Sequence, residues 1–418
     1  MPRRGRRRRE LETILFAAGL WLVPWPAVAA QGELTSAAGL EFANYAHDCA
    51  RMVSLPEPTG GYAVGTVTYH WVDRSRPDGL TPDPHDDRQV MVTLFYPAGE
   101  TAGGARAPYF PELELLRAGF MTDQRDLPHQ IADQIAVRGC VSTHAFSNAP
   151  VATTSTGFPL VLLSPGGNVS RHSHTALAED LASHGWVVAV MSHLHSGWDV
   201  FPEGGFVMSS PYWQGPDSAS EAELARLDDE LASMLAADAV FTLDRLSVLS
   251  AADPSGRLTG RIDATRVAVV GHSRGGSTVG RACHVDARFG ACVILDNIGP
   301  EPETEVGLSQ PQLTIRRPWP EDRVGQLDAF LGRNKSEAID AVIAGTVHMS
   351  FTDLPLISPE RYDASTEPGR AHKICTALTR AFLEEHVLGR DGELPTFPEV
   401  TLRRFSPRPP AGQDGSRP

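Results

Sequence analysis

The sequence predicts an α/β fold with a mostly parallel central sheet, an antiparallel N-terminal start and helices on both faces. From residue 158 onward, short apolar runs alternate with helical patterns, which is typical of parallel strands joined by crossover helices. The runs at 158–163 and 186–191 are continuously apolar, as expected of strands that are buried on both faces. Before them, an alternating segment at 62–71 and an apolar segment at 90–96 indicate two antiparallel strands.

The remaining elements follow from periodicity and from the residues that end helices and strands. Leucines one turn apart, followed by Gly185 as a C-terminal stop, predict a helix at 174–184. Leucines at mostly three- and four-residue spacings predict a long helix that includes 224–246. We also expect a polar loop at 74–87, strands at 266–270, 291–295, 312–316 and 341–344, and helices at 277–288 and 371–388.

Length and charge allow a large folded core and exclude two classes of partner. The chain has 418 residues, of which 41% are apolar and 21% are charged, so extensive disorder is excluded. The first twelve residues hold six arginines and two glutamates, which amounts to a net charge of +4. Because the whole chain carries −14, the remaining residues carry −18. So acidic a body argues against nucleic acid and against an anionic membrane surface as partners.

The N-terminus has the three parts of an export signal. Arginines between residues 3 and 9 form a basic region, an apolar run covers 14–22, and Ala27-Val28-Ala29 fits a cleavage site. The apolar run is shorter than the roughly 18–20 residues that cross a bilayer, so we expect cleavage rather than an uncleaved anchor. The sequence therefore predicts a secreted or periplasmic protein with a signal peptide at 1–29 and no stable membrane span after cleavage.

The rest of the chain divides into an extension, one large domain and a tail. We expect an N-terminal extension at 30–59, the α/β domain at 60–390 and a Pro-rich, frayed tail at 391–418. The segment 192–217 is rich in Gly, Pro and aromatic residues and is a candidate lid. Five cysteines permit disulfides after export, and their odd number leaves at least one without an intrachain partner. Neither the pairing nor the oligomeric state follows from the sequence.

The most informative motif is Gly271-His272-Ser273-Arg274-Gly275, which directly follows the strand expected at 266–270. It matches G-x-S-x-G, the tight strand-to-helix turn on which a serine projects from the sheet of an α/β-hydrolase. Glycines flank the serine because a Cβ at either place would collide with the neighbouring strand or helix. The motif predicts Ser273 as a nucleophile, and the alternative is a Gly-rich turn with a passive serine.

A serine nucleophile requires a base, and the base requires an acid that orients it. In this fold the chain order is Ser, then Asp or Glu, then His. Asp296 directly follows the strand at 291–295 and is the predicted acid, although a turn-forming Asp would also suit this place. His348 follows the strand at 341–344 and is the predicted base rather than a surface histidine. Alternative acids are Asp322, Asp328 and Asp353.

The oxyanion of the tetrahedral intermediate requires backbone N–H donors. One donor comes from the residue after the nucleophile, which is Arg274. The other comes from the loop after an early strand, here Ser164-Pro165-Gly166-Gly167-Asn168, and Gly167 is our choice.

Two histidine pairs raise the question of a metal. His172 with His174, and His193 with His195, each form an H-x-H pair that places both rings on one face of a strand. Neither spacing matches a known ligand motif, and a metal generally needs three or more protein ligands. No C-x-x-C pair is present either. We therefore predict no metal and no cofactor, with one of His193 and His195 available to line the pocket.

Four stretches together resemble the plasma-type platelet-activating factor acetylhydrolases and their bacterial relatives. They are Gly61 to Gly65 leading to Val92 to Pro97, Phe158 to Gly167 continuing through Leu181 to Val188, the elbow Gly271 to Gly276, and Gly345 to Asp353. The resemblance implies a calcium-independent serine esterase that releases short or oxidised acyl groups from phospholipids or similar esters. It also implies Ser273 as nucleophile, Asp296 as acid, His348 as base, and Gly167 and Arg274 as oxyanion donors.

Two departures from that family bear on the substrate. The loop Ser164-Pro165-Gly166 replaces the more usual S-H-G and resembles cutinases and polyester hydrolases. Arg274 replaces an apolar or aromatic residue, so its charge either binds an anionic head group or pairs with a surface acid. We therefore expect a small-molecule or lipid ester as substrate, with a cutinase-like polyester hydrolase and a non-catalytic binding protein of the same fold as alternatives.

Overall fold

The computed structural model describes residues 52–81, 83–101, 104–113, 138–201, 206–216, 218–300 and 303–407. The predicted signal peptide at 1–29, most of the predicted extension and the end of the predicted tail lie outside these ranges. Within the described residues, no helix combines the length and the apolar character needed to cross a bilayer.

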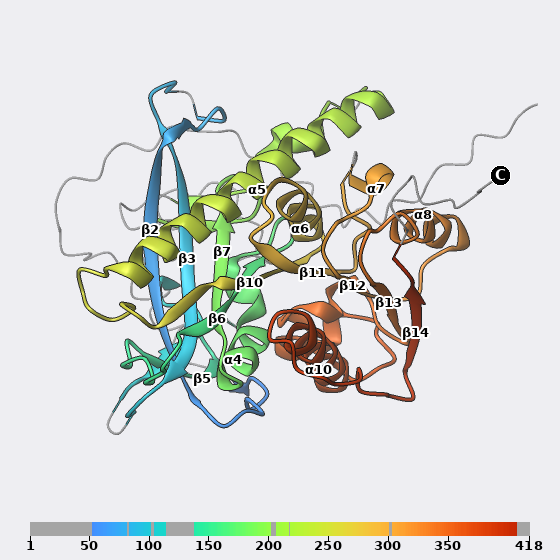
Figure 1. The fold of residues 1–418 in the computed structure, drawn as a ribbon. Coiled ribbons are helices and arrows are strands. Elements are labelled where there is room, and N and C mark those ends of the chain that lie inside the picture. Colours follow the sequence, from blue (N-terminus) through green and yellow to red (C-terminus); the bar gives the residue numbers. More distant parts are fainter. Residues whose placement is uncertain are drawn as a thin grey trace, which may run out of the picture. The chain divides into compact units, whose positions relative to one another are not determined.

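Twelve strands of the described chain form one mixed sheet, in the order β1-β5-β2-β3-β7-β6-β10-β11-β12-β13-β14, with β4 paired to β5 (Figure 1). Their bounds are β1 Val53–Ser54, β2 Ala63–Pro77, β3 Asp87–Ala98, β4 Arg106–Pro108, β5 Val141–Ser147, β6 Phe158–Ser164, β7 Val187–His193, β10 Ile262–His272, β11 Phe289–Leu295, β12 Gln312–Arg316, β13 Ala338–Ile343 and β14 Val400–Phe405. The neighbours from β7 to β13 run parallel, and β3 is antiparallel to both β2 and β7. This arrangement is the predicted parallel sheet with an antiparallel start.

Helices cover both faces of the sheet. Their bounds are α4 Thr175–Ser183, α5 Glu221–Ala251, α6 Arg274–Val285, α7 Glu303–Val306, α8 Glu321–Leu331, α9 Leu354–Ile357 and α10 Pro368–His386. One apolar core lies under α5, α6 and α8, and the other lies under α4 and α10 (Figure 1). In β10 the side chains of Val267 and Val269 enter the first core and those of Ala268 and Val270 enter the second, because successive residues of a strand point to opposite faces.

Local sequence explains where the longest helices begin. Ser220 precedes α5, and its side chain accepts a hydrogen bond from the Glu223 amide while the Glu223 carboxylate accepts one from the Ser220 amide. This capping box satisfies two N–H groups that the first turn leaves unpaired. Glu367 caps α10 in a similar way, with Pro368 in the first turn, where its missing N–H costs nothing.

The sheet is wider than the sequence predicted. Strands β1, β4 and β5 extend its N-terminal edge, and β14 pairs antiparallel with β13 at the other edge. The prediction of a frayed tail from residue 391 is therefore wrong for 400–405. The predicted loop at 74–87 is also too long, because β2 continues to Pro77 after a shift in register beyond Asp73. Helix α8 and the small hairpin β8 Asp199–Val200 with β9 Phe206–Val207 were not predicted.

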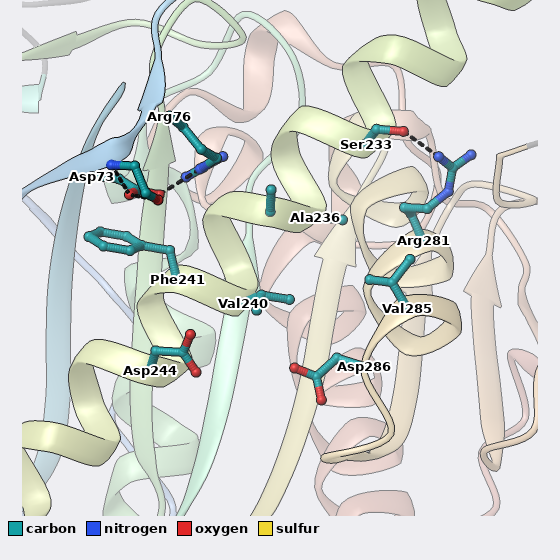
Figure 2. A pocket seen from close by; sticks show the side chains of 12 residues that line it. Asp73, Arg76, Ser233, Ala236, Val240, Phe241, Asp244, Arg281, Val285 and Asp286 are labelled. Atoms are coloured by element: carbon teal, nitrogen blue, oxygen red, sulfur yellow. Dashed lines mark hydrogen bonds and ion pairs between the residues drawn. The ribbon is translucent and has the colours of Figure 1, made fainter. Parts of the chain in front are cut away.

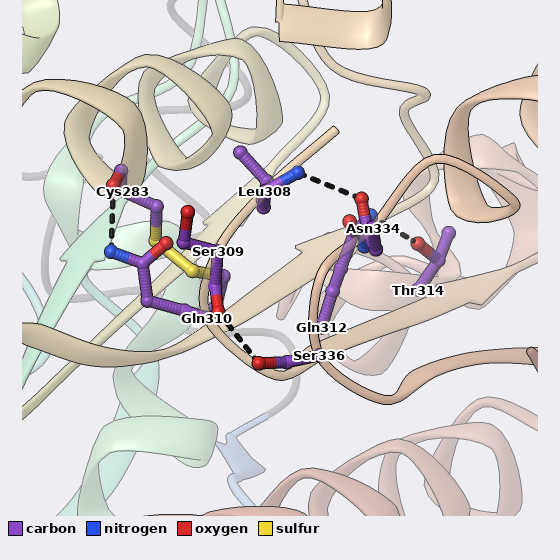
Figure 3. Close-up of a disulfide and its surroundings, with 9 residues drawn as sticks. Cys283, Leu308, Ser309, Gln310, Gln312, Thr314, Asn334 and Ser336 are labelled. Atoms are coloured by element: carbon purple, nitrogen blue, oxygen red, sulfur yellow. Dashed lines mark hydrogen bonds between the residues drawn. A yellow bond between two sulfur atoms is a disulfide. The ribbon is translucent and has the colours of Figure 1, made fainter. Parts of the chain in front are cut away.

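A disulfide joins two elements that lead to the site. Cys283 near the end of α6 is bonded to Cys292 in β11, and both residues are buried (Figure 3). Cys140 is disulfide-bonded as well, whereas Cys375 is a buried free thiol. The bridge in Figure 3 therefore connects the helix that starts at the elbow with the strand that directly precedes Asp296.

Candidate active site

Ser273 lies at the turn between β10 and α6, in a backbone conformation that L-residues rarely adopt. Its φ is +53° and its ψ is −120°. A Cβ on Gly271 would lie 2.1 Å from the Gly275 carbonyl oxygen, and one on Gly275 would lie 2.0 Å from the Ser164 carbonyl oxygen. Both glycines are therefore required by close backbone approach, as the motif predicted, and the turn raises the serine above the ends of the parallel strands.

The three side chains predicted from chain order meet at this turn. The Nε2 atom of His348 lies 2.9 Å from the Ser273 Oγ, and its Nδ1 lies 2.6 Å from the Asp296 Oδ2. His348 begins the short 3₁₀ turn His348–Phe351 after β13, and Asp296 directly follows β11. The Asp296 side chain is 1% exposed, whereas that of His348 is 39% exposed. The carboxylate is thus shielded from water, whereas the imidazole is partly exposed to solvent.

Asp296 accepts hydrogen bonds from residues that the sequence did not single out. Its Oδ1 accepts from the Trp319 indole at 2.8 Å and from the Arg317 amide at 3.2 Å. Its Oδ2 accepts from the Arg317 Nε at 3.2 Å in addition to His348. Each carboxylate oxygen thus has two nitrogen partners, and together these hydrogen bonds orient Oδ2 toward the imidazole. No motif marks Trp319 or Arg317, because their partner is more than twenty residues away.

The alternative acids have other partners. Asp328 on α8 lies 2.7 Å from the Arg403 guanidinium of β14. Asp353 is buried and accepts hydrogen bonds from the Ala176 amide and from the Tyr109 hydroxyl, and burial raises its pKa to about 7. Asp322 lies in the exposed first turn of α8. Among the described residues, Asp296 is the carboxylate that contacts His348.

His272, the residue before the serine, is a further member of the site. Its Nε2 lies 2.9 Å from the His348 carbonyl oxygen, and the two rings are 4.7 Å apart. Burial lowers the pKa of His272 well below its usual value, with the His348 and His174 charges acting in the same direction. A neutral His272 therefore contacts the His348 backbone without adding a charge beside that ring. His272 lies at the first x of G-x-S-x-G, where the motif specifies no residue, so the sequence offered no reason to select it.

Of the two predicted oxyanion donors, Arg274 directly follows the serine, and Gly167 lies against the Arg274 side chain. Arg274 is the first residue of α6, and Gly167 belongs to the loop after β6. A Cβ on Gly166 would come within 3.2 Å of the Ser273 Cβ, which shows how close this loop lies to the serine. A Cβ on Gly167 would lie 2.6 Å from the Arg274 Nη1. A side chain at residue 166 would therefore press on Ser273 and His272, and one at residue 167 would displace the end of the Arg274 side chain.

His193, one of the histidines considered above as a metal ligand, belongs to a second hydrogen-bonded Ser–His–Asp chain. The His193 Nε2 lies 2.8 Å from the Ser164 Oγ, and its Nδ1 lies 3.0 Å from the Asp238 Oδ2 of α5. All three residues are buried. Burial alone would raise the pKa of Asp238, but the Arg88 guanidinium and His193 lower it below its usual value. Both ring nitrogens of His193 are thus occupied by protein atoms.

The other three histidines of the two pairs, His172, His174 and His195, have separate surroundings. His195 lies 3.4 Å from Asp78, His172 lies 3.3 Å from Glu112, and burial lowers the pKa of His174 to about 3. In the described part of the chain, one trio of metal-ligand side chains converges, namely Glu337, Glu385 and His386. The Arg404 guanidinium already lies 2.6 Å from Glu337, so an ion pair occupies that carboxylate.

The predicted lid segment is partly packed against α5. Trp213 is buried with Leu231 and Leu235, and the Ser196 carbonyl accepts a hydrogen bond from the Asn168 amide of the oxyanion loop. A cavity of about 490 Å³ lies elsewhere, between β2, α5 and α6 (Figure 2). Its lining includes Arg76 and Asp244 but none of Ser273, Asp296 and His348.

Comparison with known proteins yields one family and several ester hydrolases. The family model of platelet-activating factor acetylhydrolase, isoform II, matches residues 48–197 and 246–393. The platelet-activating factor acetylhydrolase of Gallus gallus is 24% identical over 377 residues, which cover 81% of this chain and 85% of that protein. A protein of Arthroderma benhamiae, named probable 1-alkyl-2-acetylglycerophosphocholine esterase, is 24% identical over 258 residues, or 58% of each chain.

A solved structure supports the same fold. The ferulic acid esterase from Streptomyces cinnamoneus matches with a TM-score of 0.68 and 29% identity, covering 84% of this chain and 99% of that one. This similarity and the parallel sheet with helices on both faces confirm the predicted α/β-hydrolase fold. The family match confirms the resemblance that the four sequence stretches indicated.

Proposed function

Because the chain belongs to the family of platelet-activating factor acetylhydrolase, isoform II, and that family hydrolyses esters, we propose that it cleaves carboxylic esters with Ser273 as nucleophile, His348 as base and Asp296 as orienting acid. The observation that carries the proposal is the hydrogen-bonded order Asp296–His348–Ser273 at a strained elbow. A hydroxyl is a weak nucleophile, and an imidazole within hydrogen-bond distance is the group that activates it.

The proposed reaction has two halves. The Ser273 Oγ attacks the ester carbonyl carbon while the His348 Nε2 takes its proton, and the amides of Gly167 and Arg274 bind the oxyanion. The imidazolium then gives that proton to the alcohol oxygen, the C–O bond breaks and the alcohol leaves. Water, deprotonated by His348, attacks the acyl-enzyme, and Ser273 regains its proton as the acid departs. Throughout, Asp296 accepts a hydrogen bond from the Nδ1–H group and stabilises the charged ring.

The proposed substrates are esters with a short or oxidised acyl group, which is the class that the family resemblance implies. The named activities of the relatives and of the solved esterase concern different alcohols and acids, so the acyl length must be measured. A cutinase-like polyester hydrolase remains the rival within enzymes. We further propose export of the chain, with 1–29 removed and 60–390 as the catalytic domain.

Acyl preference and serine dependence can be tested together. The purified protein and its Ser273→Ala variant are assayed on 4-nitrophenyl esters from about two to about sixteen acyl carbons, a range that probes pocket depth. We expect activity that peaks at short chains and is lost in the variant, with an unchanged circular dichroism spectrum. A peak at long chains, or release of soluble products from a polyester film, would favour the rival.

A fluorophosphonate probe then separates an enzyme from a binding protein of the same fold. We expect labelling that maps to the peptide holding Ser273 and disappears in Ser273→Ala. Ser277→Ala, one turn further along α6, is the matched control and should label normally. Absence of labelling in the wild-type protein would leave the binding protein as the better account.

A further inference from the structure

The side chain of Arg274 lies at the edge of the candidate oxyanion hole. A Cβ on Gly167 would lie 2.6 Å from its Nη1, 2.8 Å from its Cζ and 3.1 Å from its Nε, so the guanidinium covers the face of Gly167. Its Nη1 also donates a hydrogen bond to the Ser196 carbonyl oxygen at 3.3 Å. The guanidinium thus lies against Gly167, and the neighbouring residue, Gly166, is the one that approaches Ser273.

This charge lacks the compensation that two buried arginines nearby receive. Arg88 pairs with Asp78 and Asp238, and Arg171 pairs with Glu112 and Asp199. By contrast, none of the carboxylates in the described ranges lies within 4.0 Å of Arg274, whose polar partner there is a carbonyl oxygen.

The electrostatic setting is that of a cation without a close counterion. Burial lowers the pKa of Arg274, and the charge that opposes this change is that of the exposed Asp228 on α5. A guanidinium has five donors in a planar fork that fits carboxylate and phosphate oxygens. A half-buried guanidinium with a single weak acceptor therefore has donors available to a ligand.

We propose that the Arg274 guanidinium binds an anionic group, a carboxylate or a phosphate, that the ester substrate carries close to its scissile bond. The proposal rests on the proposed function, because it takes the Gly167 and Arg274 amides as the place of the carbonyl oxygen. The guanidinium covers residue 167 itself, so the anion must lie only a few atoms from that carbonyl. Gly167 contributes by leaving the space that any side chain would take from the guanidinium.

The test compares esters that differ only in one charge. On the acyl side the pair is 4-nitrophenyl hemisuccinate and 4-nitrophenyl butyrate, which have equally long acyl chains. On the alcohol side the pair is 4-acetoxybenzoate and 4-acetoxybenzamide, whose amide group is neutral and adds no second ester bond. For the full chain, we expect Arg274→Gln to lower the anionic-to-neutral ratio of kcat/KM at least about tenfold for one pair, since a charge-assisted hydrogen bond is lost. The affected pair identifies the half of the substrate that carries the anion.

Two comparisons keep the result specific to Arg274. Arg288→Gln removes one positive charge just beyond the far end of the same helix and should leave both ratios unchanged. Arg274→Lys keeps the charge but loses the planar fork, so it should retain part of the preference. In the wild-type protein, added salt should weaken the preference for the anionic ester, because mobile ions screen the charge.

The outcomes separate this proposal from the proposed function. Hydrolysis of all four esters with ratios that Arg274→Gln does not change would refute the anion site while leaving the esterase intact. An equal loss on charged and neutral esters would also refute it, since the guanidinium would then act on the oxyanion itself. No hydrolysis of any of the four esters by the wild-type protein would count against both proposals. If Arg274→Gln fails to fold, the salt dependence and Arg274→Lys still decide.

Discussion

Replacing Asp296 by asparagine should impair the candidate site through the tautomer of His348. Two N–H donors, from Trp319 and Arg317, point at Oδ1, and in the variant only the amide oxygen can accept them. The amide NH₂ must then occupy the position of Oδ2, 2.6 Å from the His348 Nδ1. It would donate to Nδ1, which moves the ring hydrogen to Nε2, where the base needs a free lone pair.

The expected loss is large because the wrong tautomer cannot accept the serine proton. The corresponding change in a serine protease lowers kcat by about 10⁴, which equals about 5 kcal/mol of transition-state stabilisation. We expect a similar factor in kcat, with a smaller change in KM, because substrate binding does not need the tautomer.

The assay is steady-state hydrolysis of 4-nitrophenyl butyrate, with circular dichroism as a check on folding. Asp322→Asn and Asp328→Asn are the controls, since both acids are alternatives by sequence and neither contacts His348 in the structure. An Asp296→Asn variant that keeps more than a tenth of kcat would refute the reasoning. So would an equal loss in either control variant.

Three further predictions concern the surroundings of the site. Replacing both Cys283 and Cys292 by alanine should lower the free energy of unfolding by about 2–3 kcal/mol, because the bridge closes a short loop; an unchanged melting temperature would contradict this. Burial raises the pKa of Glu179 to about 8, so the folded state keeps a proton that the unfolded chain releases from about pH 4.5. The free energy of unfolding should therefore fall from about pH 4.5 to 8. In chemical denaturation at about pH 5 and 9, Glu179→Gln should remove this fall; the same pH dependence in the variant and in the wild-type protein would contradict the prediction. Gly167→Ala should lower kcat/KM at least about tenfold by displacing the Arg274 guanidinium. In a double-mutant cycle, Gly167→Ala should cost less when Arg274→Gln is already present; strictly additive losses would show that Gly167→Ala does not act through Arg274.

The core of the fold and the candidate site followed from the sequence because both depend on local patterns. A buried strand has a recognisable apolar run, and the glycines of the elbow are dictated by contacts within a few residues. Asp296 and His348 were predicted from their place after such strands, and the structure brings them to Ser273. The order of the three residues along the chain was therefore enough to predict which side chains meet.

What the sequence did not predict depends on partners far along the chain. The strand β14 has arginines where an apolar strand would have aliphatic residues, and Arg403 pairs with Asp340 of β13 and Asp328 of α8. Short strands such as β1 have too few residues for a periodic signal. The environment of Asp296 was equally hidden, because the Trp319 indole reaches it only after β12 and the following turn have folded.

The buried chain of Ser164, His193 and Asp238 has a consequence for recognising hydrolases by geometry. In the described residues, a search for three side chains at serine-hydrolase distances would match both the chain that ends at Ser273 and the chain that ends at Ser164. In the second, Ser164 and Asp238 are 0% exposed and His193 is 5% exposed, so the Ser164 hydroxyl is closed to an ester. We therefore expect an acylating reagent to label Ser273 and not Ser164, because both serines contact a histidine that contacts an aspartate and the two sites differ in access.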